Sequence, residues 1–186
     1  MLIEHNREKL LNAIIYFLQN TKYCGKTKLF KLLYYLDFMH FRETGRSVTG
    51  LDYYAWQFGP FPKVLADDIN KPPDDLREKI SIQCTPDDSN FTCMKPRKKF
   101  DDTFFTKREL KILENVAFIF KEAKAEDIVE ASHLPSHPWD KTIHRKGEKT
   151  KIDYTLALDD SDASLSLEEV LERLKDKEGL KKAFNG

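Results

Sequence analysis

The chain has 186 residues, a length that suits one domain with a sizeable hydrophobic core. Its 31 Lys and Arg residues balance 31 Asp and Glu residues, so no net charge draws the protein toward nucleic acids or anionic membranes. Apolar residues make up 40% of the chain, which argues against wholesale disorder.

Two helices are predicted first. Apolar residues at helical spacing predict a helix over residues 6–19. A second helix is predicted over residues 27–42, with Thr27 as its N-cap and Gly45 as its stop signal. Apolar and aromatic side chains cover most of its circumference, so we expect it to be buried on most sides. Its expected core spine is Leu29, Leu32, Leu33 and Leu36.

Asp37 is the unusual residue of this second helix. Helical spacing places it beside apolar and aromatic side chains, where an unpaired carboxylate costs free energy. We expect it to accept hydrogen bonds from a tyrosine hydroxyl, a helix N-terminus or a lysine. A structural role is favoured over a catalytic one, because the sequence places no second acid or nucleophile beside it.

An aromatic segment follows the second helix. Residues 53–58 have the composition of a strand, and Gly59-Pro60 is expected to end that strand, because proline cannot donate to a ladder. Pro62 is expected in the first turn of a short helix that runs to Ile69. Residues 71–75 are then expected to form a linker-like break.

Alternating apolar and polar residues next predict a β-hairpin. Its strands cover residues 80–84 and 91–95, and its turn lies at residues 86–90. A hairpin centred on this turn would set Cys84 across from Cys93. We favour reduced thiols over a disulfide between them, because the chain has an odd number of cysteines and is too long to need one.

The second half of the chain begins with a capping box. Thr106, followed three residues later by Glu109, predicts the start of a helix over residues 107–121. A further helix is predicted over residues 126–133.

The C-terminal third is predicted to hold shorter elements. One or two helical turns are expected over residues 139–145, ending at Gly147, and a strand over residues 152–158. Ser166 and Glu169 predict a second capping box before a C-terminal helix over residues 167–177. The predicted fold is α+β and mainly α-helical: a single compact domain over residues 1–186, with about six helices and a small antiparallel sheet or hairpin.

Three histidines form the only cluster of residues typical of catalysis or metal binding. His133, His137 and His144 lie within a dozen residues, and such side chains bind metals or transfer protons. Pro135 argues against one continuous helix that would align the first two. The favoured alternative is structural: His133 and Trp139 tie down a loop through hydrogen bonds to backbone groups.

Other signatures of chemistry are missing from the sequence. It contains no phosphate-binding glycine loop, nucleophile elbow or His-Glu-x-x-His motif, so we expect neither an enzyme nor a cofactor. The basic run at residues 95–99 is followed by Asp101 and Asp102, so no direct contact with nucleic acid is expected. Charges near the N-terminus leave no room for a signal peptide, and we expect a soluble, cytoplasmic protein without a membrane segment.

An ordered set of motifs gives the sequence a family resemblance. Residues 28–34 read Lys-Leu-Phe-Lys-Leu-Leu-Tyr, and they are followed by Ala55-Trp56, Gly59-Pro60, Ser132-His133 and Pro138-Trp139. In this order and spacing the chain resembles the Panacea domain, also called the SocA-like antitoxin domain, over nearly its whole length.

The resemblance implies an antitoxin. Such proteins are encoded beside a toxin and neutralise it through direct protein–protein binding, and one branch delivers its toxin to a bacterial protease as an adaptor. The expected partners are therefore a cognate toxin and, in the adaptor alternative, a cellular protease. Aromatic anchors suit such an interface, and the candidate partner-binding residues are Tyr35, Tyr53, Phe58 and Phe61. The alternative that each of them is simply core stays open.

Overall fold

The computed structural model describes residues 5–84 and 92–159, and all that follows concerns these residues. The described part is mainly helical, with two small antiparallel sheets, so the predicted α+β class is confirmed. The helices are α1 (His5–Asn20), α2 (Lys26–Thr44), α3 (Lys63–Asn70), α4 (Asp74–Lys79), α5 (Lys107–Ile119), α6 (Ala125–Ser132) and α7 (Pro138–Lys146). The strands are β1 (Tyr54–Trp56), β2 (Gly59–Phe61), β3 (Ile80–Cys84) and β4 (Thr92–Pro96), and two 3-10 turns are η1 (Asp102–Phe104) and η2 (Tyr154–Ala157).

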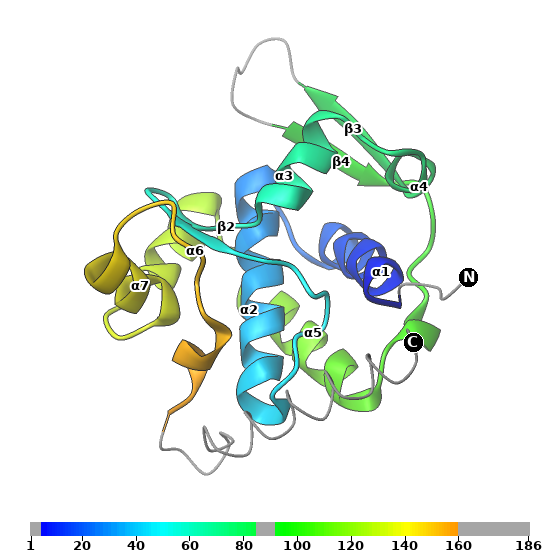
Figure 1. Cartoon of the computed structure of the whole chain (residues 1–186). Helices are drawn as coiled ribbons and strands as arrows, with labels where there is room; N and C mark the ends of the chain where they lie inside the picture. The colour runs from blue at the N-terminus through cyan, green and yellow to red at the C-terminus, as the bar shows by residue number, and fades with distance from the viewer. Residues whose placement is uncertain (1–4, 85–91, 160–186) are drawn as a thin grey trace, which may run out of the picture.

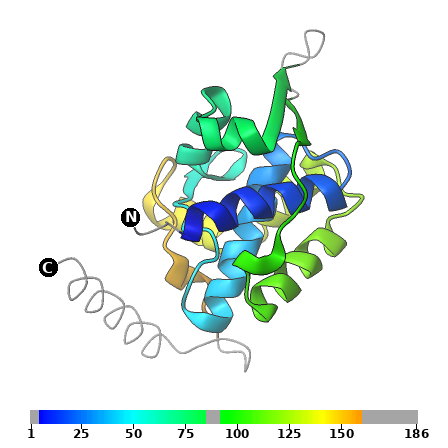
Figure 2. The same cartoon turned by 90° about the vertical axis from the view of Figure 1, so that its right-hand side faces the viewer.

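Helix α2 is the centre of the fold. It runs through the middle of the molecule, with α1 and α5 on one side and α6 and α7 on the other (Figure 1). Figure 2 shows α1 crossing α2. The expected spine of leucines is confirmed, because all four are fully buried: Leu29, Leu32, Leu33 and Leu36. Burial of such side chains is the main favourable term in folding, so α2 organises the core.

Two of the predicted helix ends are confirmed, and one is not. Gly45 adopts a left-handed conformation (φ 69°) and donates its N–H to the Phe41 carbonyl at 2.7 Å, so the predicted stop of α2 is confirmed. The predicted capping box of Thr106 and Glu109 is also confirmed. The predicted N-cap of α2 was wrong: the cap is Gly25, in an extended conformation, and Thr27 lies inside the first turn.

The aromatic segment forms a hairpin, whereas the sequence predicted one strand over residues 53–58 that ends at Gly59-Pro60. Strand β1 pairs with β2 so that Ala55 lies opposite Pro60, and Gly59-Pro60 therefore belongs to the returning strand. Ala55 donates its N–H to the Thr150 carbonyl at 2.8 Å and accepts from the Lys149 N–H at 2.7 Å. Ala55, which lies opposite Pro60, thus makes its backbone hydrogen bonds to this distant segment. The pairing of β1 with β2 therefore does not need an N–H group from Pro60.

Two segments adopt structures that the sequence did not predict. Helix α4 begins at Asp74, inside the linker-like break predicted over residues 71–75, because Leu76 is buried and Asp75 accepts hydrogen bonds from Arg7 of α1. Residues 154–157 form a 3-10 turn where a strand over 152–158 was expected. There the Asp153 side chain accepts from the Thr155 N–H at 2.9 Å and turns the backbone away from an extended path.

The second hairpin is confirmed with a shifted register. Strands β3 and β4 pair so that Cys93 lies opposite Gln83, and Cys84 pairs with Thr92, so the predicted Cys84–Cys93 pairing was wrong by one residue. The predicted helix over residues 167–177, with its capping box at Ser166 and Glu169, lies outside the described residues. None of the helices in the described ranges has both the length and the hydropathy that crossing a bilayer requires.

Candidate functional site

Asp37 fixes the loop that leads into the β1–β2 hairpin. Its carboxylate accepts hydrogen bonds from the backbone N–H groups of Val48 (2.8 Å) and Thr49 (2.7 Å). It also accepts from the Thr49 hydroxyl at 2.5 Å and the Tyr53 hydroxyl at 2.9 Å. Complete burial raises the pKa of Asp37 to about 6, and the four donors oppose that rise. Of the three partners predicted for Asp37, the tyrosine hydroxyl is confirmed, and these bonds hold α2 to the loop that leads into the hairpin.

Gly59 lets the hairpin approach two helices closely. Its φ of +89° is a conformation that residues with a Cβ rarely adopt. A Cβ at this position would lie 2.7 Å from the Ser132 hydroxyl oxygen of α6 and 2.9 Å from the Lys31 Cε of α2. It would also lie 3.2 Å from the His133 Nε2. The hairpin, α2 and α6 can meet here because residue 59 has no side chain, and Figure 1 shows β2 beside both helices.

Lys31 is a buried cation beside this contact. The residue is 2% exposed, and its Nζ donates to the Pro60 carbonyl at 3.2 Å. Burial lowers the pKa of Lys31 to about 8. No carboxylate of the described residues forms an ion pair with it within 4.0 Å. Lys31 is therefore a buried ammonium group that lacks a countercharge in the described part of the chain.

Lys28 shows how a buried lysine on the same helix is normally satisfied. It is fully buried, and its Nζ donates to the carbonyls of Lys22 (2.7 Å), Ala123 (2.5 Å) and Lys121 (3.5 Å). These carbonyls belong to the segments that follow α1 and α5, so Lys28 ties both helix ends to α2. Its role is structural.

His133 and Trp139 lie against the hairpin, next to Gly59 and Trp56 respectively. Their rings stack at 3.8 Å between centroids with an interplanar angle of 16°. The Trp139 Nε1 donates to the Trp56 carbonyl at 2.9 Å, as expected for an indole that ties down a loop. The buried His133 Nε2 has no hydrogen-bond partner among the described residues, so the backbone bond expected for this imidazole is absent there. Burial and the charge of Lys31 both lower the pKa of His133, which favours the neutral ring.

A pocket of about 360 Å³ opens on the outer side of the hairpin. We call it the hairpin pocket, and it is lined by Lys26, Thr27, Phe30, Lys31, Trp56, Gln57, Phe58, Gly59 and Phe61. The Phe61 ring stacks on Trp56 at 4.5 Å and meets Phe30 edge-on at 5.6 Å. Phe58 at the hairpin turn is 68% exposed. The pocket thus combines aromatic walls with two lysines, and no acidic residue lines it.

The structure separates the four predicted partner-binding residues. Phe58 and Phe61 both line the hairpin pocket. Tyr35 lies on another part of the surface, where its ring stacks on Phe120 at 5.0 Å. Tyr53 is fully buried and offers no surface to a partner. Sequence reasoning missed Lys31, although a lysine in a helix expected to be buried on most sides was a signal that could have found it.

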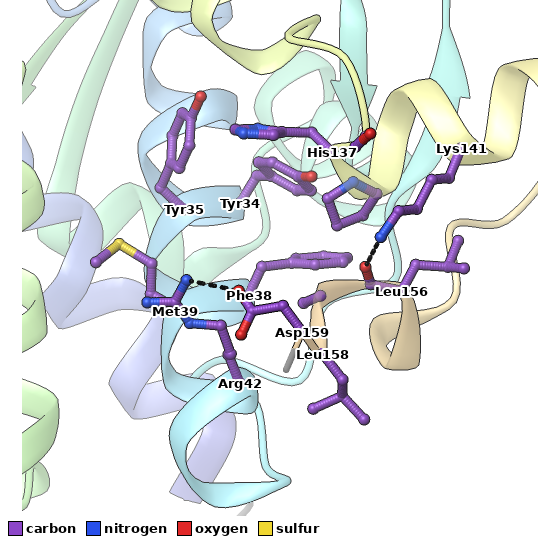
Figure 3. Close-up of a pocket in the computed structure, with 13 residues that line it drawn as sticks. Tyr34, Tyr35, Phe38, Met39, Arg42, His137, Lys141, Leu156, Leu158 and Asp159 are labelled. Atoms are coloured by element: carbon purple, nitrogen blue, oxygen red, sulfur yellow. Dashed lines mark hydrogen bonds and ion pairs between the residues drawn. The ribbon is translucent and has the colours of Figure 1, made fainter. Parts of the chain in front are cut away.

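A second pocket contains Tyr35 and His137 (Figure 3). Its volume of about 170 Å³ is below the range that is usual for small-molecule sites. Its basic side chains have partners, since Lys141 donates to the Leu156 carbonyl at 3.2 Å and Arg42 pairs with Asp159 at 3.4 Å. This second pocket is therefore a weaker candidate for a binding site than the hairpin pocket.

The three histidines do not form one site. His133 lies behind the hairpin, His137 lines the second pocket, and His144 is exposed with its Nδ1 3.1 Å from an Asp140 carboxylate oxygen. Across residues 5–84 and 92–159, no group of three or more His, Cys, Asp or Glu side chains is placed to hold a metal ion.

Comparison with protein families identifies the domain. The chain matches the family described as "Antitoxin SocA-like, Panacea domain" over residues 29–140, which is more than half of its length. The protein belongs to this family. No curated protein and no solved structure matched the chain. The Panacea match includes Lys31, the β1–β2 hairpin, Ser132-His133 and Trp139, so the motifs that resemble the family meet at one place in the fold.

Proposed function

We propose that this Panacea-domain protein is an antitoxin that neutralises a cognate toxin, encoded by an adjacent gene, through direct protein–protein binding. Family membership supports an antitoxin role. The observation that carries the binding mode is the hairpin pocket, where Trp56 is 40% and Phe58 68% exposed. Aromatic side chains of this kind are enriched at the centres of protein interfaces.

The hairpin is suited to present these side chains because it is held rigidly. Ala55 bonds to residues 149 and 150 on one side, and the Trp56 carbonyl accepts from the Trp139 indole. An anchor that is already ordered loses little conformational entropy on binding. Phe58 therefore combines high exposure with a position on a hairpin whose backbone is held at Ala55 and Trp56.

Co-expression tests this function. The product of the adjacent gene should arrest growth when it is expressed alone, and co-expression of this protein should restore growth and yield a complex that co-purifies. The Phe58→Ala variant should lose both effects. Phe118→Ala is the matched control, because Phe118 is 79% exposed on α5 and lies outside the hairpin pocket. Absence of both rescue and complex would refute the proposal, whereas full rescue by Phe58→Ala would place binding elsewhere on the protein.

The same cells distinguish direct neutralisation from delivery to a protease. Direct neutralisation predicts that the toxin persists at an unchanged half-life inside an inactive complex. A toxin half-life that shortens only when this protein and a cellular protease are both present would instead identify a proteolytic adaptor.

A further inference from the structure

We propose that the hairpin pocket binds an acidic side chain of the partner protein, flanked by apolar residues, and that Lys31 is the counter-ion for its carboxylate. The identity of that partner as a toxin rests on the function proposed above, but the chemistry of the pocket does not.

The charge of Lys31 lacks compensation. An ammonium group has three N–H donors, and in the described structure Lys31 uses one of them, toward the neutral Pro60 carbonyl. Lys28, on the same helix, instead satisfies its ammonium with three carbonyls. Buried charges in proteins are usually paired, because an unpaired one loses its hydration without replacement. A carboxylate from a partner would supply both the missing charge and the missing acceptors.

Space for that carboxylate exists beside Gly59. The hairpin pocket has a volume of about 360 Å³, and both Lys31 and Gly59 line it. Larger side chains surround this position, with Phe30 and Phe61 in edge-to-face contact. A carboxylate that reached Lys31 would lie in a largely desolvated environment, where charge-assisted hydrogen bonds are strongest.

The surroundings favour a peptide segment over a nucleic acid. Trp56 and Phe58 offer exposed aromatic surface on which apolar residues next to the acidic one can pack. The only other charged residue that lines the pocket is Lys26, whose Nζ donates to Asn70 Oδ1 at 3.0 Å. Nucleic-acid sites need an extended set of cations for successive phosphates, which two lysines in a chain of zero net charge do not provide.

Selection from a library of random peptides displayed on phage tests the proposal without knowledge of the toxin. The full chain is the bait, and the selected peptides are synthesised and their affinities measured by fluorescence anisotropy. We expect enriched peptides to carry Asp or Glu between apolar residues. Replacement of that acid by its amide, or Lys31→Met in the protein, should weaken binding by about tenfold or more. Lys111→Met is the matched control, because Lys111 is an exposed lysine of α5 outside the pocket, and it should leave affinity unchanged.

A spectroscopic readout separates a direct contact from an indirect effect on folding. The Cε resonance of Lys31, followed by NMR as pH rises, reports the pKa of its ammonium group. An acidic peptide should raise that pKa, because a neighbouring carboxylate stabilises the charged form, and the amide peptide should not. Circular dichroism checks that Lys31→Met is folded.

Several results would overturn the inference: no enrichment, enrichment of peptides without an acid, equal affinity for Lys31→Met, an unchanged Lys31 pKa, or equally strong binding of a single-stranded oligonucleotide. Failure of the inference is distinguishable from failure of the proposed function. Rescue of growth together with acid-independent peptide binding would refute the inference alone. Acid-dependent peptide binding without rescue would refute the antitoxin role and leave the site in place.

Discussion

Replacement of Lys31 by methionine should stabilise the protein. The lowering of the Lys31 pKa from 10.5 to about 8 means that its buried charge costs the folded state about 3 kcal/mol, at about 1.4 kcal/mol for each pKa unit. Methionine has a similar length and no charge, but it leaves the Pro60 carbonyl without its donor, at a cost of about 1 kcal/mol. The net expected gain at pH 7 is about 2 kcal/mol, or roughly 4–8 °C in Tm for a chain of this size.

The gain should also depend on pH with a definite sign. The folded-state pKa of Lys31 is lower than the unfolded-state value, so between about pH 8 and 10.5 the unfolded chain holds a proton that the folded chain has released. The free energy of unfolding of the natural protein therefore rises through this window relative to that of Lys31→Met. The advantage of the variant should be complete below pH 8, should vanish near about pH 10, and should become a deficit of about 1 kcal/mol above pH 10.5, where only the lost hydrogen bond to Pro60 remains.

Urea unfolding of both proteins at pH 7, 9 and about 10.5, analysed by linear extrapolation, measures this difference. Other groups whose pKa values are raised, such as Cys24 (to about 11) and Tyr35 (to about 12), titrate in both proteins and cancel in the comparison. If Lys31→Met were destabilised at pH 7, or if the difference between the proteins did not change with pH, the view of Lys31 as an uncompensated buried charge would be refuted.

Three further substitutions probe the surrounding structure, each by urea unfolding. Gly59→Ala should lower the free energy of unfolding by about 4 kcal/mol, because backbone strain at positive φ adds to the collision of the new Cβ with Ser132. Gly147→Ala, also at positive φ (+81°) but with open space around it, should cost about 2 kcal/mol from backbone strain alone, and equal costs would contradict this. Asp37→Asn should lower the free energy of unfolding by about 3 kcal/mol, because the amide would present its own N–H group to donors that bond to a carboxylate in the natural protein. An unchanged urea midpoint would contradict a structural role for Asp37. Thr106→Ala removes half of a capping box and should cost about 1 kcal/mol, with Thr106→Ser retaining most of the stability.

The elements that the sequence predicted well are those with local causes. Helix α5 begins at a capping box whose two partners are three residues apart, and α2 ends at a glycine whose conformation needs only its own backbone. The spine of α2 follows from helical spacing alone. Such signals are complete within one short window of sequence.

The elements that the sequence did not predict depend on distant partners. Pro60 fits inside a strand because its neighbour Ala55 bonds to residues 149 and 150, and nothing near Pro60 reveals this. Helix α4 likewise forms where the Asp75 carboxylate accepts a hydrogen bond from Arg7 of α1. The candidate site combines both cases: its aromatic residues were visible in the sequence, but the burial of Lys31 follows from the way α2 and the hairpin meet.

The same long-range assembly sets when the protein can act. The residues that line the hairpin pocket lie between positions 26 and 61, but Trp139, which donates to the Trp56 carbonyl, comes much later. A ribosome must therefore release residue 139 and more before the hairpin is fully held in place. A nascent or truncated chain would carry the aromatic residues without the arrangement that holds them. A partner that binds only the assembled pocket also stabilises the fold, by about 2.7 kcal/mol when its free concentration is 100 times Kd. For the antitoxin function proposed above, this means that protection would begin only after the segment that contains Trp139 has been made, and that a complex would outlast the free protein wherever proteases degrade unfolded chains.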